Sequence, residues 1–197
     1  EDIDSSSKLH QAQSDALESL YIENPCTDVI YGQYAGYTEE PNVDSNSKTD
    51  TYVALKLASH DKRWTHVPFY LQTGKKLSNR MGVIVIRFKN NDQLVLELQP
   101  HDKMMLVLSN NDVIRLKTED VCGDFDASYP EAYERLLLEA TQQNPTSFVS
   151  YNQVHLCWAL IENIIEACKA SIIHSYTPNS NGPKAKNSLR SSDSWYL

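Results

Sequence analysis

The sequence predicts an α+β fold in which a large, predominantly antiparallel sheet carries helices on one face. Two observations favour this class. Short segments with alternating apolar residues, separated by turn-forming residues, fill positions 28–110 and favour antiparallel pairing. Segments with helical periodicity follow them, at 129–142 and about 151–170, so the strands precede the helices instead of alternating with them.

Composition describes an ordinary globular protein: 197 residues, of which 41% are hydrophobic and 22% charged. A net charge of −8 argues against binding to nucleic acid, and no apolar run reaches the length that a membrane-spanning helix needs. The four cysteines form no C-x-x-C pair, which argues against a zinc site or a redox pair. They are Cys26, Cys122, Cys157 and Cys168. We therefore expect a reducing, cytoplasmic location, with neither a membrane nor a nucleic acid as partner.

The alternating segments predict six strands, and polar residues separate them. The predicted strands are residues 28–34, 51–59, 67–73, 82–89, 93–99 and 104–109. A polar loop is expected at 36–50, and tight turns at 90–92 and 110–112. The turn at 90–92 connects two of the strongest strands, so these should pair as neighbours.

The two faces of the predicted sheet differ in polarity. One is uniformly apolar, as with Val53 and Leu55 in the strand 51–59, and should carry the helices. The other mixes apolar side chains with Lys56, Arg87 and Glu97, whose opposite charges could pair across strands. Two interpretations of this half-polar face stay open: a solvated sheet surface, or a surface for subunit contact.

Three segments predict helices. Residues 6–21 have a weak helical period, residues 129–142 follow a possible cap at Ser128, and Ser150 caps a helix that reaches about residue 170. The longest helix has a stripe that we expect in the core. The stripe consists of Val154, Trp158, Ile161, Ile165 and Cys168. From Tyr176 on, the tail should be loop with short ordered pieces.

The chain begins at Glu1, within or just before a helical pattern, which indicates a cut chain. We expect residues 1–22 to be a helical segment that continues from an absent amino-terminal part. Residues 23–197 then form the domain proper.

One cluster of cations is a candidate binding site. Residues 73–80 (TGKKLSNR) hold three cations between two predicted strands, and Gly74 lets the backbone bend. Lys75 and Arg80 could converge on an anionic or polyhydroxyl ligand, since Lys provides a compact charge and Arg a planar fork. The alternative is a solvated basic turn. Elsewhere the chain lacks glycine-rich phosphate loops and metal-ligating clusters, and His155 is better explained as a residue at the edge of the core than as a base.

Motifs spread along the chain resemble those of the glucose-6-phosphate dehydrogenase family. Residues 32–34 (GQY) match its G-Q-Y, and residues 37–43 (YTEEPNV) match Y-x-E-E-P-x-V. Residues 47–56 (SKTDTYVALK), 63–70 (RWTHVPFY) and 73–77 (TGKKL) resemble S-x-T-x-T-F-x-A-L-K, R-W-x-G-V-P-F-Y and T-G-K-x-L. IRF at 86–88, LQP at 98–100, PEAYERL at 130–136 and SNGP at 180–183 recur in the family's order. Their number and order, over residues 21–195, identify the chain as similar to the carboxyl-terminal, substrate-binding and dimerisation domain of this family.

The resemblance implies a parent oxidoreductase that oxidises glucose 6-phosphate to the lactone with NADP. The family's nucleotide-binding Rossmann domain, its catalytic histidine and its main phosphate-gripping segment precede the G-Q-Y motif, so they lie outside this chain. By resemblance, Lys75 contacts the sugar substrate, Arg80 is a basic substrate-binding residue, and Gln99 lies near the substrate pocket. The chain alone is expected to be inactive. It is expected to form a homodimer, or a dimer of dimers, through the sheet.

Some family members hold a second, structural NADP in this domain. Here three positions that the resemblance assigns to basic residues carry Gln72, Glu97 and Asn181, so we expect no structural nucleotide. Two further departures replace family glycines with His66 and Asn179, which bears on the geometry of their loops.

Two functions therefore remain as hypotheses. In the first, the chain is the second domain of a glucose-6-phosphate dehydrogenase and supplies substrate binding and dimerisation. In the second, it is a free-standing, non-catalytic dimerisation or regulatory member of the family. The NADP or NAD preference belongs to the absent domain in either case.

Overall fold

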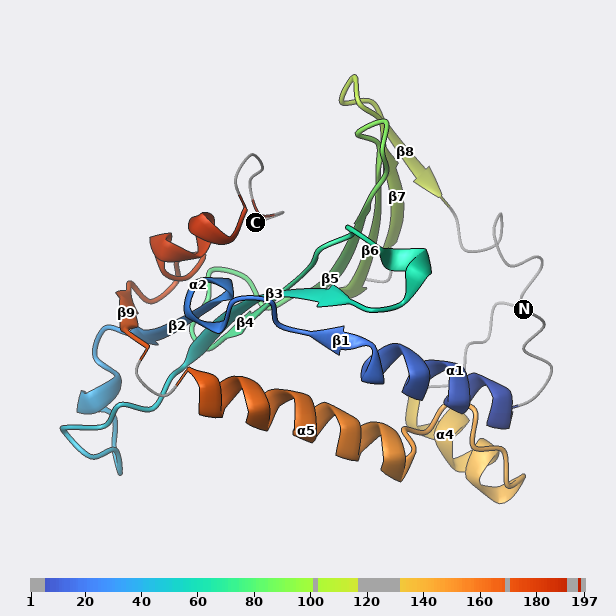
Figure 1. Cartoon of the computed structure of the whole chain (residues 1–197), viewed down its shortest axis with the longest axis horizontal. Helices are drawn as coiled ribbons and strands as arrows, with labels where there is room; N and C mark the ends of the chain where they lie inside the picture. The colour runs from blue at the N-terminus through green and yellow to red at the C-terminus, as the bar shows by residue number, and fades with distance from the viewer. Residues whose placement is uncertain (1–5, 101–102, 117–131, 169–170, 191–194, 196–197) are drawn as a thin grey trace. The chain divides into compact units, whose positions relative to one another are not determined.

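The computed structural model describes residues 6–100, 103–116, 132–168, 171–190 and 195 (Figure 1). By its internal contacts the chain separates into two compact units. The first consists of residues 1–76 and 130–195, and the second of residues 77–129 with 196–197. Each unit has its own sheet, and every strand pair except one is antiparallel within the described residues. The expected α+β class is confirmed.

The first unit is built around the strand β3 (Tyr52–Ser59). β3 pairs antiparallel with β2 (Val29–Tyr34), with β4 (Phe69–Gly74) and, at its end, with β1 (Leu20–Tyr21). The short strand β9 (Ile173–Tyr176) pairs parallel with β2. Helices and 3-10 turns complete the unit: α1 (Ser6–Glu18), α2 (Pro25–Asp28), η1 (Tyr37–Glu39), η2 (Lys62–Trp64), α4 (Ala132–Thr141), α5 (Tyr151–Ala167) and η3 (Lys184–Leu189).

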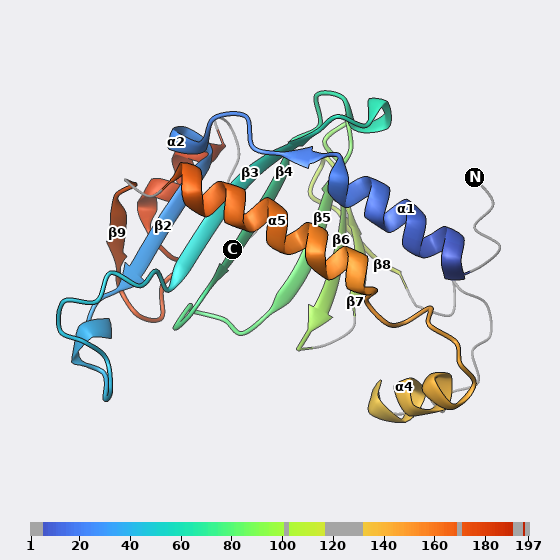
Figure 2. The ribbon, with the colours of Figure 1, turned by 60° about the horizontal axis from the view of Figure 1, so that its bottom comes forward.

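Both faces of β3 are covered. On one face, Leu55 and Leu57 pack with Val29 of β2 against Ile164 of α5, which is 2% exposed. Figure 2 shows α5 crossing these strands. This is the apolar face that the sequence predicted to carry a helix, and that prediction is confirmed.

The carboxyl-terminal segment covers the opposite face of β3. Tyr52 is 2% exposed there, and a Cβ added to Gly182 would lie only 2.5 Å from its ring. Gly182 has φ = 90°, in the left-handed region that glycine adopts without steric cost. The tail is therefore closely packed on the sheet, with the short ordered pieces that the sequence predicted.

The start of α5 confirms the predicted cap at Ser150. Its hydroxyl accepts a hydrogen bond from the Gln153 N–H at 3.3 Å, and the Gln153 side chain accepts one from the Ser150 N–H at 2.6 Å. This reciprocal pair satisfies donors that the first helical turn would otherwise leave open. The amide of Gln153 also donates to Gln13 at 2.6 Å and so ties α5 to α1.

The predicted core stripe of α5 is wrong except at Cys168. Four of its members are exposed, Trp158 by 61%. The exposed residues are Val154, Trp158, Ile161 and Ile165. The helix is apolar around much of its circumference, so periodicity alone did not select the buried stripe. The stripe that packs on the sheet contains Leu160, Ile164 and Cys168.

The second unit is a four-stranded antiparallel meander. Its strands are β5 (Gly82–Arg87), β6 (Gln93–Gln99), β7 (Lys103–Val107) and β8 (Val113–Leu116), in that order. The two hairpin turns repeat one design, because Asn91 and Asn111 both adopt a left-handed conformation, with φ of 68° and 70°. Asparagine tolerates this region well, and both predicted turns are confirmed.

The charges expected on the half-polar face have partners. Glu97 of β6 lies opposite Lys103 of β7, with 3.7 Å between carboxylate and ammonium. In the first unit, the Lys56 ammonium lies 3.6 Å from the buried carboxylate of Asp28. Glu97 thus pairs across strands with Lys103, which the sequence analysis did not name, and Lys56 pairs with Asp28 of the helix α2 instead.

Several expectations are wrong or lie outside the described residues. The strands β1, β8 and β9 were not predicted from the sequence; β1 includes Leu20 and Tyr21, which were expected at the end of the first helix. Ser128, as a cap for α4, and Cys122 lie outside the described residues. No helix in the described part of the chain is both long and apolar enough to cross a bilayer.

Candidate functional site

Lys75 follows β4 directly, and its backbone is held from both sides. Its N–H donates to the Thr51 carbonyl at 2.8 Å, which continues the β3–β4 ladder by one residue. Its carbonyl accepts a hydrogen bond from the Tyr176 hydroxyl at 2.7 Å. The Lys75 side chain is exposed, and no carboxylate among the described residues pairs with its ammonium. A fixed backbone thus presents an uncompensated cation.

The neighbouring Lys76 is in a different state. Its ammonium forms an ion pair with Glu40 and lies 4.6 Å from the centre of the Tyr34 ring. The hydrogen bond to Glu40 raises the pKa of Lys76, and the same contact lowers the pKa of Glu40. The structure therefore distinguishes two adjacent lysines that the sequence could not tell apart. Lys76 is neutralised by Glu40, and Lys75 has no such partner among the described residues.

A hydrogen-bonded network connects this turn to the middle of the sheet. The Thr51 hydroxyl accepts from the Tyr34 N–H at 3.0 Å and lies 3.0 Å from the Tyr176 hydroxyl. The Thr51 N–H donates to the Gly32 carbonyl at 2.7 Å. Thr51 thus links β2, the last residue of β9 and the Lys75 turn. The sequence placed Thr51 and Tyr34 in family motifs but gave them no role at the site.

The other two predicted site residues belong to the second unit. Gly82 pairs with Gln99 at one end of the β5–β6 hairpin, and Arg80 lies two residues before Gly82. The structure therefore brings Arg80 and Gln99 to the same end of this hairpin. Both side chains are exposed, and a cis peptide bond follows Gln99. Lys75 belongs to the first unit, so its convergence with Arg80 stays a prediction.

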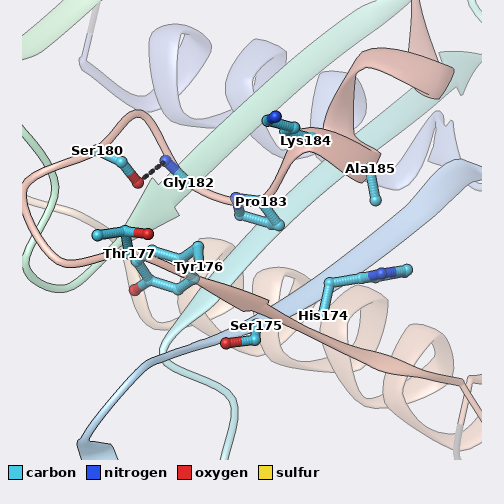
Figure 3. A pocket seen from close by; sticks show the side chains of 9 residues that line it. All are labelled: His174, Ser175, Tyr176, Thr177, Ser180, Gly182, Pro183, Lys184 and Ala185. Atoms are coloured by element: carbon cyan, nitrogen blue, oxygen red, sulfur yellow. Dashed lines mark hydrogen bonds between the residues drawn. The ribbon is translucent and has the colours of Figure 1, made fainter.

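A hollow lies between β9 and the segment before η3 (Figure 3). Its volume is about 350 Å³, and the ring of Tyr176 is part of its lining. The Ser180 hydroxyl accepts from the Gly182 N–H at 3.3 Å beside it, which shapes the turn. None of the three predicted site residues lines this hollow. It shares only Tyr176 with the surroundings of Lys75.

The positions relevant to a structural nucleotide are engaged within the chain. The Gln72 side-chain oxygen accepts from Tyr52 at 3.0 Å and from the ammonium of Lys186 at 3.1 Å. Lys186 is buried, also donates to the Asn181 carbonyl at 2.5 Å, and has its pKa lowered by burial. Glu97, the third of these positions, pairs with Lys103. The expectation that this domain holds no structural nucleotide stays a prediction.

Metal and acid–base chemistry find no further support in the described residues. No group of three His, Cys, Asp or Glu side chains there could hold a metal ion. His155 is exposed on α5 and stacks on Tyr151, with ring centroids 6.5 Å apart. It has no place in the surroundings of Lys75.

Comparison with known proteins gives consistent results. Residues 3–196 match the family described as "Glucose-6-phosphate dehydrogenase, C-terminal domain". The chain is 36% identical to a glucose-6-phosphate 1-dehydrogenase from Chlamydia trachomatis, over 85% of this chain and 42% of that protein. It is 32% identical to one from Bacillus subtilis, over 78% of this chain and 36% of that protein. The chain thus spans about two fifths of the length of these curated relatives.

Solved structures agree with the sequence relatives. The glucose-6-phosphate 1-dehydrogenase of Mycobacterium avium superposes with a TM-score of 0.75 at 25% identity, covering 98% of this chain and 46% of that one. A glucose-6-phosphate dehydrogenase in complex with glucose 6-phosphate superposes with a TM-score of 0.81 at 19% identity, which supports the fold. With nearly all of its residues matched, the chain belongs to the glucose-6-phosphate dehydrogenase family and represents that family's C-terminal domain.

Proposed function

We propose that this chain is the substrate-binding and dimerisation half of a glucose-6-phosphate dehydrogenase. The parent enzyme oxidises glucose 6-phosphate to 6-phosphogluconolactone with NADP. The observation that carries the proposal is the state of Lys75: its backbone is fixed and its ammonium is unpaired among the described residues, whereas the adjacent Lys76 is neutralised by Glu40. An unpaired cation on a rigid turn suits the recognition of an anionic sugar.

The role of this chain is positioning and charge neutralisation. Lys75 supplies a compact positive charge, and Arg80 a planar fork, to phosphate or hydroxyl oxygens of the substrate. Gln99, at the same end of the β5–β6 hairpin as Arg80, adds an amide that can donate and accept. Such groups raise the local concentration of correctly oriented substrate without moving a proton.

The hydride acceptor is assigned to another part of the parent enzyme. The 197 residues contain no G-x-G-x-x-G sequence, which is the fingerprint of a dinucleotide-binding turn. We therefore assign NADP and the catalytic base to sequence outside this chain, and we expect the chain alone to be inactive. A cytoplasmic location is part of the proposal, in keeping with the free thiols of Cys26, Cys157 and Cys168.

Dimerisation through the sheet is part of the same proposal. The sequence made the half-polar face the candidate for subunit contact, but in the second unit it is the uniformly apolar face that has several exposed side chains. The exposed members of this face include Ile84, Ile86, Leu98 and Ile114. Apolar clusters of this kind commonly mark contact surfaces. Light scattering of the purified chain tests this, and a strictly monomeric particle at high concentration would contradict an autonomous interface.

The enzymatic proposal is tested with the complete gene product that contains this chain. Purified complete protein should reduce NADP only when glucose 6-phosphate is present, and the 197-residue chain should not. A gene product that begins at the present Glu1 would support the non-catalytic alternative instead. So would a complete protein that lacks activity with both NADP and NAD.

A further inference from the structure

We propose that Tyr176 is a positioning residue for substrate binding, acting through the backbone of Lys75. The inference rests on the proposed role of Lys75 and adds a residue that lies 101 positions away in the chain. Tyr176 is the last residue of β9, is 4% exposed, and is part of a tail that the sequence alone described as loop. Its role is to hold the backbone that presents Lys75, without itself contacting the substrate.

The direction of the hydrogen bonds follows from counting protons. A phenol has one hydrogen to donate, and the nearest acceptor of Tyr176 is the Lys75 carbonyl at 2.7 Å, compared with 3.2 Å to the Thr51 carbonyl. The Thr51 hydroxyl, 3.0 Å away, then donates to the phenol and itself accepts from the Tyr34 N–H. The result is one continuous chain from β2, through Thr51 and Tyr176, to Lys75. Linked hydrogen bonds of this kind reinforce one another.

The same tail also holds the next residue of the turn. The Asn179 N–H donates to the Lys76 carbonyl at 2.7 Å, and the Lys76 ammonium is paired with Glu40. Lys76 has φ = 48°, a left-handed conformation that is costly for a residue with a Cβ. Because the turn adopts an unfavourable conformation, contacts from outside must keep it there, and Tyr176 and Asn179 provide two of them.

Rings around Tyr176 keep its hydroxyl in place. Tyr52 and Tyr34 lie 5.7 Å and 6.3 Å from it between ring centroids. Burial raises the pKa of Tyr176, so the phenol keeps its proton at neutral pH. Binding costs less conformational entropy when the backbone of the lysine is already fixed, since that part of the ordering is complete before the substrate binds.

The structural half of the proposal is tested on the 197-residue chain, without substrate. The variant Tyr176→Phe removes only the hydroxyl. Tyr52→Phe is the matched control, because its hydroxyl donates to Gln72 at 3.0 Å and does not contact Lys75. Hydrogen exchange of residues 74–78 should become faster in Tyr176→Phe and stay unchanged in Tyr52→Phe. Equal exchange in Tyr176→Phe and the unmodified chain would overturn the proposed clamp.

The functional half is tested by steady-state kinetics in the complete enzyme. Tyr176→Phe should raise KM for glucose 6-phosphate about threefold to tenfold, the effect of losing one buried hydrogen bond, with KM for the nucleotide unchanged. In a Lys75→Ala background the same change should have no further effect on KM, because the backbone carbonyl remains but the ammonium that it positions is gone. Tyr52→Phe should leave both constants unchanged.

The possible failures can be told apart. If Lys75→Ala alone leaves KM unchanged, the proposed role of Lys75 fails and the role of Tyr176 fails with it, whatever exchange shows. If Lys75→Ala raises KM but Tyr176→Phe raises it equally with or without Lys75, Tyr176 acts elsewhere. If exchange becomes faster while KM stays constant, Tyr176 is merely structural. Each of these results contradicts the inference, and only the combination of faster exchange and a Lys75-dependent KM supports it.

Discussion

The hydroxyl of Tyr176 and the backbone carbonyl of Lys75 are 101 residues apart in the chain and 2.7 Å apart in space. This hydrogen bond joins the end of the last strand to the turn that carries the candidate substrate-binding cation. The tail is therefore a support of the site as well as a cover for the sheet.

Lys75 and Lys76 should respond differently to truncation. Lys75→Ala in the complete enzyme should raise KM for glucose 6-phosphate by about tenfold to a hundredfold, the effect of losing a hydrogen bond from a charged donor, and should lower kcat. Lys76→Ala is the matched control and should have a smaller effect on KM, because Glu40 already neutralises Lys76. Steady-state kinetics decide this, and unchanged constants in Lys75→Ala would contradict the assignment.

Gly182 should be intolerant of a methyl group. Gly182→Ala must place a Cβ 2.5 Å from the Tyr52 ring at φ = 90°, so we expect a loss of about 2 kcal/mol or more in the free energy of unfolding. Gly36→Ala has a similar φ of 86°, but its nearest neighbour would be 4.0 Å away. That control should lose only about 1 kcal/mol. Urea denaturation measures both, and equal losses would show that the tail does not pack on Tyr52.

His66 occupies a position where the backbone is left-handed, with φ = 65°. The departure from the family's glycine therefore changes the side chain and keeps the glycine-like conformation. His66→Val should lower the free energy of unfolding by about 1–2 kcal/mol, since a β-branched residue is disfavoured there. His66→Gly should not lower it. Thermal or urea denaturation of the two variants tests this, and a stable His66→Val would indicate a different loop.

Stability should fall at alkaline pH because of buried tyrosines. Burial raises the pKa of Tyr31 to about 12, and burial also raises the pKa of Tyr52 and of Tyr176. The unfolded phenol has an ordinary pKa of about 10, so the folded state binds its proton more tightly than the unfolded state does. This contribution is complete below pH ~10 and is lost as pH rises through the folded pKa. Chemical denaturation at increasing pH should show the fall in the free energy of unfolding, and tyrosinate absorbance should show the ionisation of the phenols over the same range. A free energy of unfolding that rises over this range would contradict the prediction.

The sequence predicted the strands whose apolar residues alternate, because alternation directly encodes one buried face. The apolar face of β3 with Leu55 and Leu57 is an example. The cap at Ser150 is a second local pattern that the structure confirms. The buried stripe of α5 was not predictable in the same way. Apolar residues surround much of that helix, and its orientation is set by packing on Val29 and Leu55.

The sequence could indicate the segment of the candidate site but not which of its lysines is unpaired. The cations at 73–80 drew attention to Lys75, yet nothing local distinguished it from Lys76. That difference comes from Glu40, which lies 36 residues earlier, and from Tyr176, which lies 101 residues later. β9 pairs with β2 in parallel across a still longer separation, as between Tyr31 and Ile173. Contacts between distant segments determine these features, and the local periodicity of the sequence does not encode such contacts.

The most direct test of the account is an assay of the complete protein that contains these 197 residues. We predict reduction of NADP that depends on glucose 6-phosphate, with a KM for this sugar that rises in Lys75→Ala while the KM for the nucleotide stays the same. A complete protein that reduces neither NADP nor NAD with glucose 6-phosphate, or a Lys75→Ala variant with an unchanged KM, would contradict it.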